Sequence, residues 1–156
     1  MTIDVDESHA LQDFRRGLFG HAGPGETIPT AYLAQLKNLV KSADATLGVR
    51  DSTTERRAFW VEGCVLGYLA STGLEDSNAE ITGWLIRLDD VTKLEIDVET
   101  APGDWDDSSW VSGRILEINA DTVLDASPGK FSPAKLDEIE RFIDEVLAAY
   151  AGRKLN

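Results

Sequence analysis

Three carboxylates stand close together in one short segment, at Asp104, Asp106 and Asp107, with Trp105 between the first two. Carboxylate oxygens are the ligands that calcium prefers, which makes this segment a candidate for a hard-cation site. The segment lacks the glycine and the closing glutamate of the common calcium-binding loop. We therefore interpret it as a solvated acidic loop and predict no metal.

Few residues are suited to covalent catalysis. A nucleophile needs a base within hydrogen-bond reach, and that base is most often histidine. The chain has one cysteine, Cys64, and its two histidines, His9 and His21, stand far from it in the sequence. Neither histidine has a second ligand at metal-site spacing, and the glycines of residues 20–25 lack the Lys-Ser/Thr pair of a phosphate-binding loop. We predict no catalytic residue and no cofactor, and interpret Cys64 as a small apolar core residue.

Carboxylate pairs leave one route to acid–base chemistry open. The chain has 28 Asp and Glu residues, so pairs will occur by chance. A pair becomes catalytic only when burial separates the two pKa values, as in glycoside hydrolases. Nothing in the sequence places two acids in a cleft, and a carboxylate-dependent enzyme therefore ranks third among the functions considered.

Negative charge is concentrated in the second part of the chain. Residues 1–60 hold eight Asp/Glu and seven Lys/Arg, whereas residues 61–156 hold twenty and eight, and the formal net charge is −13. Such an excess repels phosphate backbones and anionic lipids, so we predict neither nucleic acid nor a membrane as partner. A protein with a basic surface is the partner that this charge favours.

The densest acids define a predicted docking surface. Leu94, Ile96 and Val98 alternate with acids, and this period of two predicts a strand with one face on the core and one in water. Trp105 in the following loop is a candidate anchor, because aromatic residues are enriched in interface hot spots. The predicted partner surface consists of Glu95, Asp97, Glu99, Asp104, Trp105, Asp106 and Asp107.

The strands that would position these residues follow from periodicity. Alternation predicts about five strands, mostly antiparallel because their connections are short, at residues 56–71, 80–88, 93–99, 110–118 and 122–126. The first is apolar on both faces, which indicates a strand covered on two sides or one that bends at Gly63 or Gly67. A bend is predicted at Asp89-Asp90, and residues 45–55 read as a polar link.

Helices are predicted at both ends of the chain. Ser8 is a candidate N-cap for a first helix that ends at Gly20, and Pro29 introduces a second. Ser132 is the predicted N-cap of a long C-terminal helix, whose apolar stripe runs over about five turns and is closed by Gly152. That stripe must be buried, and the sheet is the available surface.

Together these elements predict a single α+β domain over residues 8–152. It comprises a helical part at 8–46, a sheet at 56–126 and a C-terminal helix at 132–151 packed on the sheet, between a frayed start at 1–7 and a tail at 153–156. The acidic start lacks the basic and apolar regions of a secretory signal, and a lone cysteine favours a reducing compartment. We therefore expect a cytoplasmic protein.

A run of strands followed by a long amphipathic helix resembles the pleckstrin-homology-like superfold. The stretch Trp84-Leu85-Ile86-Arg87-Leu88-Asp89-Asp90-Val91-Thr92-Lys93-Leu94-Glu95-Ile96 is similar to its strand, bend and strand, and the likeness covers residues 56–150. The basic lipid-binding loop often found in that fold is missing here. The resemblance concerns the fold and implies no function.

The leading functional hypothesis is a non-enzymatic protein-binding domain, of the inhibitor or immunity type, that docks its acidic surface on a basic partner. The alternative is a small-molecule or peptide-binding domain with an apolar pocket between the sheet and the C-terminal helix. Candidate lining residues for that pocket are Trp60, Trp84 and Trp110. A homo-oligomer, in which the arginine-bearing N-terminal helix meets the acidic face of another copy, is a further alternative.

Overall fold

The computed structural model describes residues 5–20, 28–52, 54–73, 79–102, 109–127 and 130–154. Within these ranges the chain is an α+β protein with two N-terminal helices, antiparallel strands and a long C-terminal helix, as predicted. The described strands number seven and form two sheets, whereas about five strands in one sheet were predicted. Its contacts divide it into two compact units, residues 1–86 and 87–156. The boundaries of a single domain over residues 8–152 stay a prediction.

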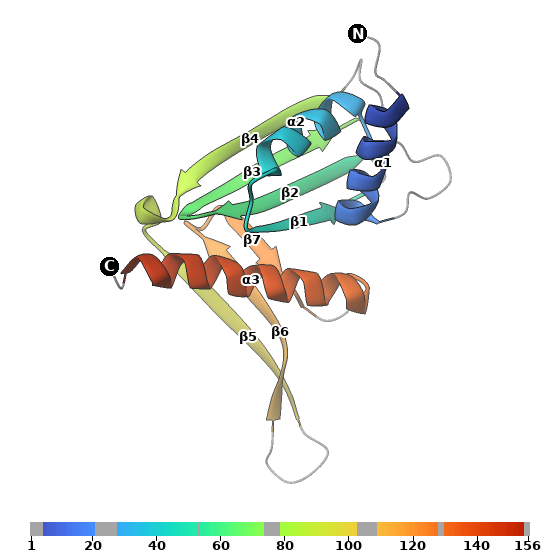
Figure 1. Cartoon of the computed structure of the whole chain (residues 1–156). Coiled ribbons are helices and arrows are strands. Elements are labelled where there is room, and N and C mark those ends of the chain that lie inside the picture. Colours follow the sequence, from blue (N-terminus) through green and yellow to red (C-terminus); the bar gives the residue numbers. More distant parts are fainter. Residues whose placement is uncertain are drawn as a thin grey trace. The chain divides into compact units, whose positions relative to one another are not determined.

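The first unit combines two helices with a four-stranded sheet. Its elements are α1 Val5–Phe19, α2 Thr30–Val40, β1 Ala45–Arg50, β2 Glu55–Glu62, β3 Val65–Thr72 and β4 Glu80–Arg87. The strands lie in the order β1-β2-β3-β4, so strands that are consecutive in the chain are neighbours in the sheet. Helices α1 and α2 lie on one face of this sheet (Figure 1).

Helix α1 begins earlier than predicted. Ser8 lies inside the helix, so the prediction that it is the N-cap is wrong. Serine is common at caps but costs little inside a helix that packing stabilises, and Leu11 and Leu18 are both buried. The end is as predicted, because Gly20 follows the last helical residue with a φ of 82° and its N–H donates to the Arg16 carbonyl at 3.0 Å.

Strand β1 lies in the segment that was predicted as a polar link, and that prediction is wrong. Leu47 and Val49 are 1% and 3% exposed and point to the same face, with Gly48 between them. Two apolar residues are too short an alternation to distinguish a strand from a loop. The strand forms because β2 offers it an antiparallel partner along its whole length, from Ala45↔Val61 to Arg50↔Arg56.

Strands β2 and β3 form a hairpin where a single strand, covered on two sides or bent at Gly63 or Gly67, was predicted. The chain reverses between Glu62 and Val65, where Gly63 has a φ of 58° and donates its N–H to Oδ2 of Asp44 at 2.8 Å. Because both strands carry apolar residues on both faces, the hydrophobic pattern of the sequence does not show where the chain reverses. Burial of β2 on two sides is confirmed, since the consecutive residues Phe59, Trp60 and Val61 are all buried.

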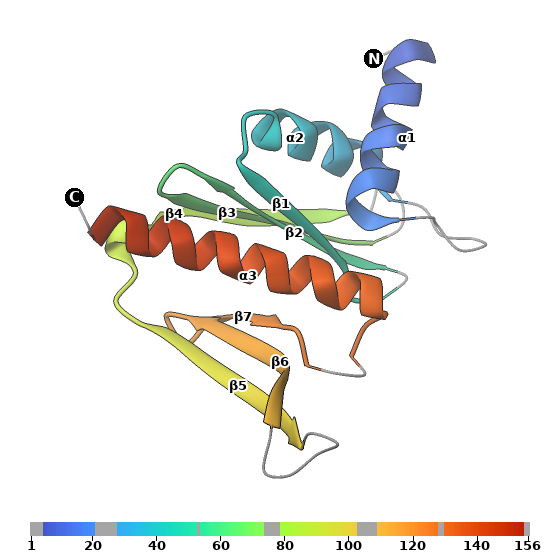
Figure 2. The ribbon, with the colours of Figure 1, turned by 60° about the horizontal axis from the view of Figure 1, so that its bottom comes forward.

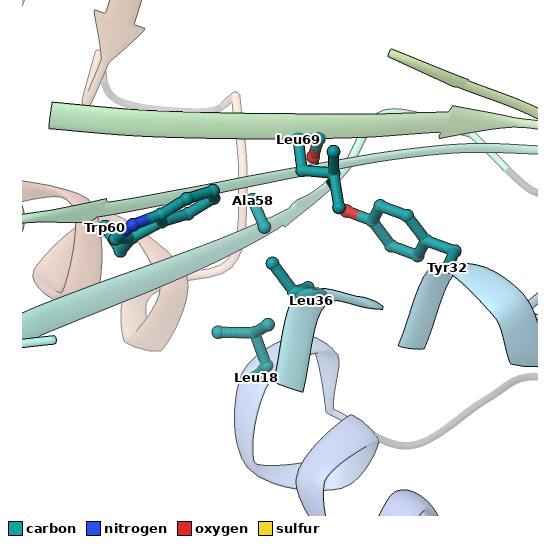
Figure 3. Close-up of a cluster of buried hydrophobic side chains, with 6 residues drawn as sticks. All are labelled: Leu18, Tyr32, Leu36, Ala58, Trp60 and Leu69. Atoms are coloured by element: carbon teal, nitrogen blue, oxygen red, sulfur yellow. Dashed lines mark hydrogen bonds between the residues drawn. The ribbon is translucent and has the colours of Figure 1, made fainter. Parts of the chain in front are cut away.

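The core of the first unit forms where the two helices meet the sheet (Figure 3). The hydroxyl of Tyr32, which is fully buried, donates to the Leu69 carbonyl at 2.9 Å and so satisfies its one polar atom. Gly67 lies beneath the indole of Trp60, and a Cβ at this position would overlap the ring. The buried members of the cluster are Leu18, Tyr32, Leu36, Ala58, Trp60 and Leu69.

The second unit combines a three-stranded sheet with one long helix. Its elements are the short 3-10 helix η1 Leu88–Asp90, β5 Leu94–Pro102, β6 Ser109–Ile118, β7 Thr122–Asp125 and α3 Pro133–Lys154. The strand order is β5-β6-β7, and α3 packs against β6, β7 and η1. Figure 2 shows the helix lying over this sheet. The predicted bend at Asp89-Asp90 is η1.

Helix α3 has the predicted start and a later end. The N–H of Lys135 donates to Oγ of Ser132 at 3.3 Å, which confirms the N-cap. The apolar stripe is buried at Ile139, Phe142, Ile143 and Val146, and each such side chain contributes about 1.5–3 kcal/mol. The helix continues through Gly152 to Lys154, so the predicted stop at Gly152 is wrong. A single glycine lowers helix stability without ending the helix.

The hairpin of β6 and β7 turns where predicted. Asn119 and Ala120 both have positive φ values, 53° and 65°, as this tight turn requires. Oδ1 of Asn119 accepts hydrogen bonds from the N–H groups of Thr92 and Lys93 at 2.9 and 3.3 Å. This side chain therefore ties the turn to the start of β5, the strand that carries the predicted acidic row.

Candidate functional site

Strand β5 places the predicted acids in one row. Glu95, Asp97 and Glu99 alternate along it and are all exposed. The register adds a residue that the sequence analysis missed, because Glu117 of β6 lies directly opposite Glu95 on the same face. We call the surface formed by Glu95, Asp97, Glu99 and Glu117 the acidic face. Alternation in residues 110–118 was visible in the sequence, but only the strand register shows which acids are neighbours.

The acidic face keeps most of its negative charge. Lys93 approaches Glu95 with Nζ 2.5 Å from Oε1, and this hydrogen bond and the carboxylate charge raise the pKa of the exposed lysine. Among the described residues, neither Asp97 nor Glu117 forms an ion pair. Like charges opposite each other, as at Glu95 and Glu117, destabilise a strand pair, and Lys93 offsets part of this repulsion because its hydrogen bond to Glu95 and the charges of both acids raise its pKa. Asp97 and Glu99 further along the strand form no ion pair with a described residue.

The opposite face of β5 departs from the prediction. Ile96 and Val98 were expected to face the core, yet they are 44% and 51% exposed. The reason is the placement of α3, which packs on β6, β7 and η1, so that β5 forms an edge of its sheet beside the helix. Ile96 and Val98 lie opposite Leu116 and Arg114 of β6, and these two apolar side chains of β5 are left exposed. Further along, β5 and β6 continue as a two-stranded ribbon (Figure 1).

The remainder of the predicted partner surface is the segment with Asp104, Trp105, Asp106 and Asp107. These four residues lie outside the described ranges, so their contribution stays a prediction. Across the described ranges, no group of three or more His, Cys, Asp or Glu residues is arranged to hold a metal ion. Cys64, expected in the core, is half-buried at the turn between β2 and β3.

An apolar pocket of about 210 Å³ lies within the first unit. Two of the three predicted tryptophans, Trp60 and Trp84, line it, but its helical wall is α2 rather than the predicted C-terminal helix. Trp110 belongs to β6 of the second unit, and its side chain lies outside the described part of the structure. The lining residues are Leu39, Trp60, Tyr68, Leu69, Gly83, Trp84 and Leu85.

Aromatic stacking supports the strand wall of this pocket. Tyr68 and Trp84 stack with ring centroids 5.1 Å apart and planes inclined by 19°, and the Phe59 ring lies 5.0 Å from that of Tyr68 with the planes tilted by 52°. Burial raises the pKa of Tyr68 above its usual value, which is itself well above neutral pH. The pocket therefore presents neutral, mostly apolar walls suited to an apolar group rather than to an ion.

The sequence analysis did not single out Arg56, which is a buried charged residue. Arg56 is only 4% exposed, and its Nη1 donates to the Ser52 carbonyl at 2.5 Å and to the Glu55 carbonyl at 3.2 Å. Burial, followed by the charge of the cross-strand neighbour Arg50, lowers its pKa. These hydrogen bonds hold the turn between β1 and β2. We assign Arg56 a structural role.

No protein-family model, curated protein or solved structure matches the chain. The resemblance to the pleckstrin-homology-like superfold accordingly stays an unconfirmed prediction. None of the helices in the described ranges is long and apolar enough to cross a membrane.

Proposed function

We propose that this protein is a non-enzymatic protein-binding domain, of the inhibitor or immunity type, whose acidic face docks on the basic surface of a partner protein. The observation that carries the proposal is the exposure of β5 on both sides. Its acids Glu95, Asp97 and Glu99 are exposed on one face, and Ile96 and Val98 are exposed on the other. A strand with this composition combines charge for steering with apolar surface for affinity.

The charge of the chain supports a protein partner over the other macromolecules. A net charge of −13 opposes the approach of phosphate groups and anionic lipids, and it attracts a surface rich in Lys and Arg. The single cysteine cannot form an internal disulfide, which supports action in a reducing compartment such as the cytoplasm.

The pocket in the first unit favours a second candidate function, the binding of a small apolar molecule or of an apolar peptide side chain. Its walls include Trp60, Trp84 and Leu39, and aromatic and aliphatic lining is typical of ligand pockets. A pocket of about 210 Å³ is smaller than most drug-sized sites, so a single side chain or a small fragment is the occupant that fits.

Neutralising the acidic face tests the leading function. The quadruple variant Glu95→Gln, Asp97→Asn, Glu99→Gln and Glu117→Gln removes four charges from one surface. We expect it to lose the basic proteins that the wild-type chain retains in affinity capture from native lysate. For a purified retained protein, the dissociation constant should rise about tenfold or more, which corresponds to about 1.4 kcal/mol. Wild-type binding should also weaken as salt is raised.

The matched control removes the same number of charges elsewhere. Glu55, Glu62, Asp137 and Glu145 are exposed and lie outside the acidic face, so their amide variants keep the net charge of the test variant. We expect this control to retain the same proteins as the wild type. Equal retention by all three chains, or equal loss from both variants, would contradict docking through the acidic face.

A further inference from the structure

Strand β4 is an edge strand of its sheet with an uncharged central part. It ends the sheet order β1-β2-β3-β4, and no other described strand pairs with its outer edge. None of its residues is buried, and the stretch from Ile81 to Ile86 contains no charge. Natural proteins usually protect such an edge with charged residues, proline or a covering element, because its free N–H and C=O groups recruit another strand. Strand β5, by contrast, carries three acids.

Side chains alternate along β4 in a way that defines two different faces. Trp84 stacks on Tyr68 on one face of the sheet, whereas Gly83 and Leu85 lie beside Leu69 and Trp60 on the face that carries α2. Leu85 is 61% exposed, the most exposed of the large apolar side chains in the described ranges. A Cβ at Gly83 would collide with the Tyr68 carbonyl oxygen. The edge therefore has a projecting leucine next to a position that holds no side chain.

These features are self-complementary. If a second copy of β4 is paired antiparallel about a two-fold axis at Trp84, Gly83 of each strand faces Leu85 of the other. Each leucine then packs over the Gly83 backbone of the other strand, where Tyr68 and Leu69 already occupy the position of a Cβ, and the two Trp84 rings lie next to each other on the opposite face.

Charge is compatible with this arrangement. Antiparallel pairing about Trp84 places Arg87 of one strand opposite Ile81 of the other, next to Glu80, and Arg87 also forms an ion pair with Asp89 of its own chain at 3.0 Å. The uncharged centre brings no acids together, which matters for two chains that each carry a net charge of −13. One short strand thus combines an exposed apolar leucine, an uncharged centre and an outer backbone edge that no other described strand pairs with.

We infer that the chain forms a two-fold homodimer through β4, in which the sheets of two copies join into one continuous eight-stranded sheet, with Gly83 opposite Leu85 and Trp84 opposite Trp84. The surface differs from the acidic face, so the dimer and the proposed docking function can fail independently. The dimer also explains why an apolar edge is left exposed on a single chain.

Sedimentation equilibrium of the full chain tests the inference. We expect the wild-type protein to have twice the mass of one chain, at low and at high salt, because an apolar strand pair is not weakened by screening. Leu85→Lys should shift the mass to that of a single chain, since it places two positively charged ammonium groups, one from each copy, at the apolar rim. Ile96→Lys on β5 is the matched control and should leave the dimer intact.

Cross-linking tests the register. In the proposed pairing Thr82 faces Ile86 of the second copy, so the double variant Thr82→Cys and Ile86→Cys, in a Cys64→Ala background, should form intermolecular disulfides under mild oxidation. Each single cysteine variant should stay uncross-linked. A monomeric wild-type chain, including one that binds an extended apolar peptide at β4 instead, would overturn the inference. A dimer unaffected by Leu85→Lys, or one that dissociates in high salt, or a failure to cross-link would overturn it as well.

Discussion

At the scale of single residues, glycines decide where bulky side chains can lie. Gly67 accepts the indole of Trp60, and this stacking lets the tryptophan be buried between the sheet and α2. Gly48 likewise accepts Leu18 of α1, whose carbonyl and side chain occupy the position where a Cβ would be. A close-packed interior has no free volume to absorb an added methyl group. Each of these positions is therefore sensitive to the smallest substitution.

Replacing Gly67 with Ala measures this sensitivity. The new methyl group overlaps the Trp60 ring, so the ring or the strand must shift, and we expect a loss of about 1–3 kcal/mol in the free energy of unfolding. Tryptophan fluorescence should change because the indole moves. The control is Gly17→Ala in α1, where a Cβ meets nothing within 4 Å and a helix interior favours alanine by about 0.5–1 kcal/mol. Urea denaturation of both variants should show a lower free energy of unfolding for Gly67→Ala and a higher one for Gly17→Ala. An unchanged free energy of unfolding in Gly67→Ala would contradict the packing of Gly67 against Trp60.

At the scale of elements, Arg114 links strand β6 to helix α3 within the second unit. Arg114 of β6 donates from Nε to Glu140 at 2.5 Å and from Nη2 to Asp144 at 2.8 Å, and both acids lie on α3. Burial opposes the charged form of the guanidinium, but the hydrogen bonds to Asp144 and Glu140 outweigh it and raise the pKa of Arg114. Together with the buried stripe of α3, this network fixes the helix against the sheet that carries the acidic face.

Loss of this network should weaken the attachment of α3. We expect Arg114→Met, which keeps the aliphatic part of the side chain, to lower the free energy of unfolding by about 1–3 kcal/mol, because hydrogen bonds to charged groups contribute in this range. Arg141→Met is the control. Arg141 is exposed on α3, and its replacement should change the free energy of unfolding by less than about 0.5 kcal/mol. Thermal denaturation followed by circular dichroism compares the stability of the two variants. Equal losses of stability would show that removal of one positive charge, rather than loss of the hydrogen-bond network, causes the effect.

At the scale of the whole molecule, charge is an opposing force. The first unit holds 12 Asp/Glu and 7 Lys/Arg, and the second holds 16 and 8, so both are negative and the total is −13. The described ion pairs, such as Arg57 with Asp51 at 2.6 Å, neutralise only part of this excess. Net repulsion of this kind destabilises the compact state and is screened by salt.

Salt should therefore stabilise the protein. We expect the midpoint of thermal unfolding to rise as sodium chloride increases from about 0.01 M to about 0.15 M, because the Debye length shortens from about 30 Å to about 8 Å over that range. A gain of about 1 kcal/mol corresponds to about 2–4 °C for a chain of this size. A falling midpoint would mean that specific ion pairs, which salt weakens, outweigh the general repulsion.

Much of the fold was predictable because local patterns carry it. The cap at Ser132 and the apolar stripe of α3, the turn at Asn119 and the end of α1 at Gly20 all depend on contacts within a few residues. The hairpin at Gly63 was not predictable from periodicity, since two-sided burial removes the alternation that would reveal a reversal. Strand β1 was missed because its pairing with β2, rather than its own composition, makes it a strand.

The candidate sites, like the fold, were predictable from the sequence only in part. By itself the sequence determined that Glu95, Asp97 and Glu99 share one face, because a strand has a period of two. Only the tertiary structure decided that Glu117 joins them, that Ile96 and Val98 are exposed, and that the pocket lies against α2. The physical reason is that register, strand length and helix placement depend on contacts between residues distant in the chain, and no local pattern records those contacts.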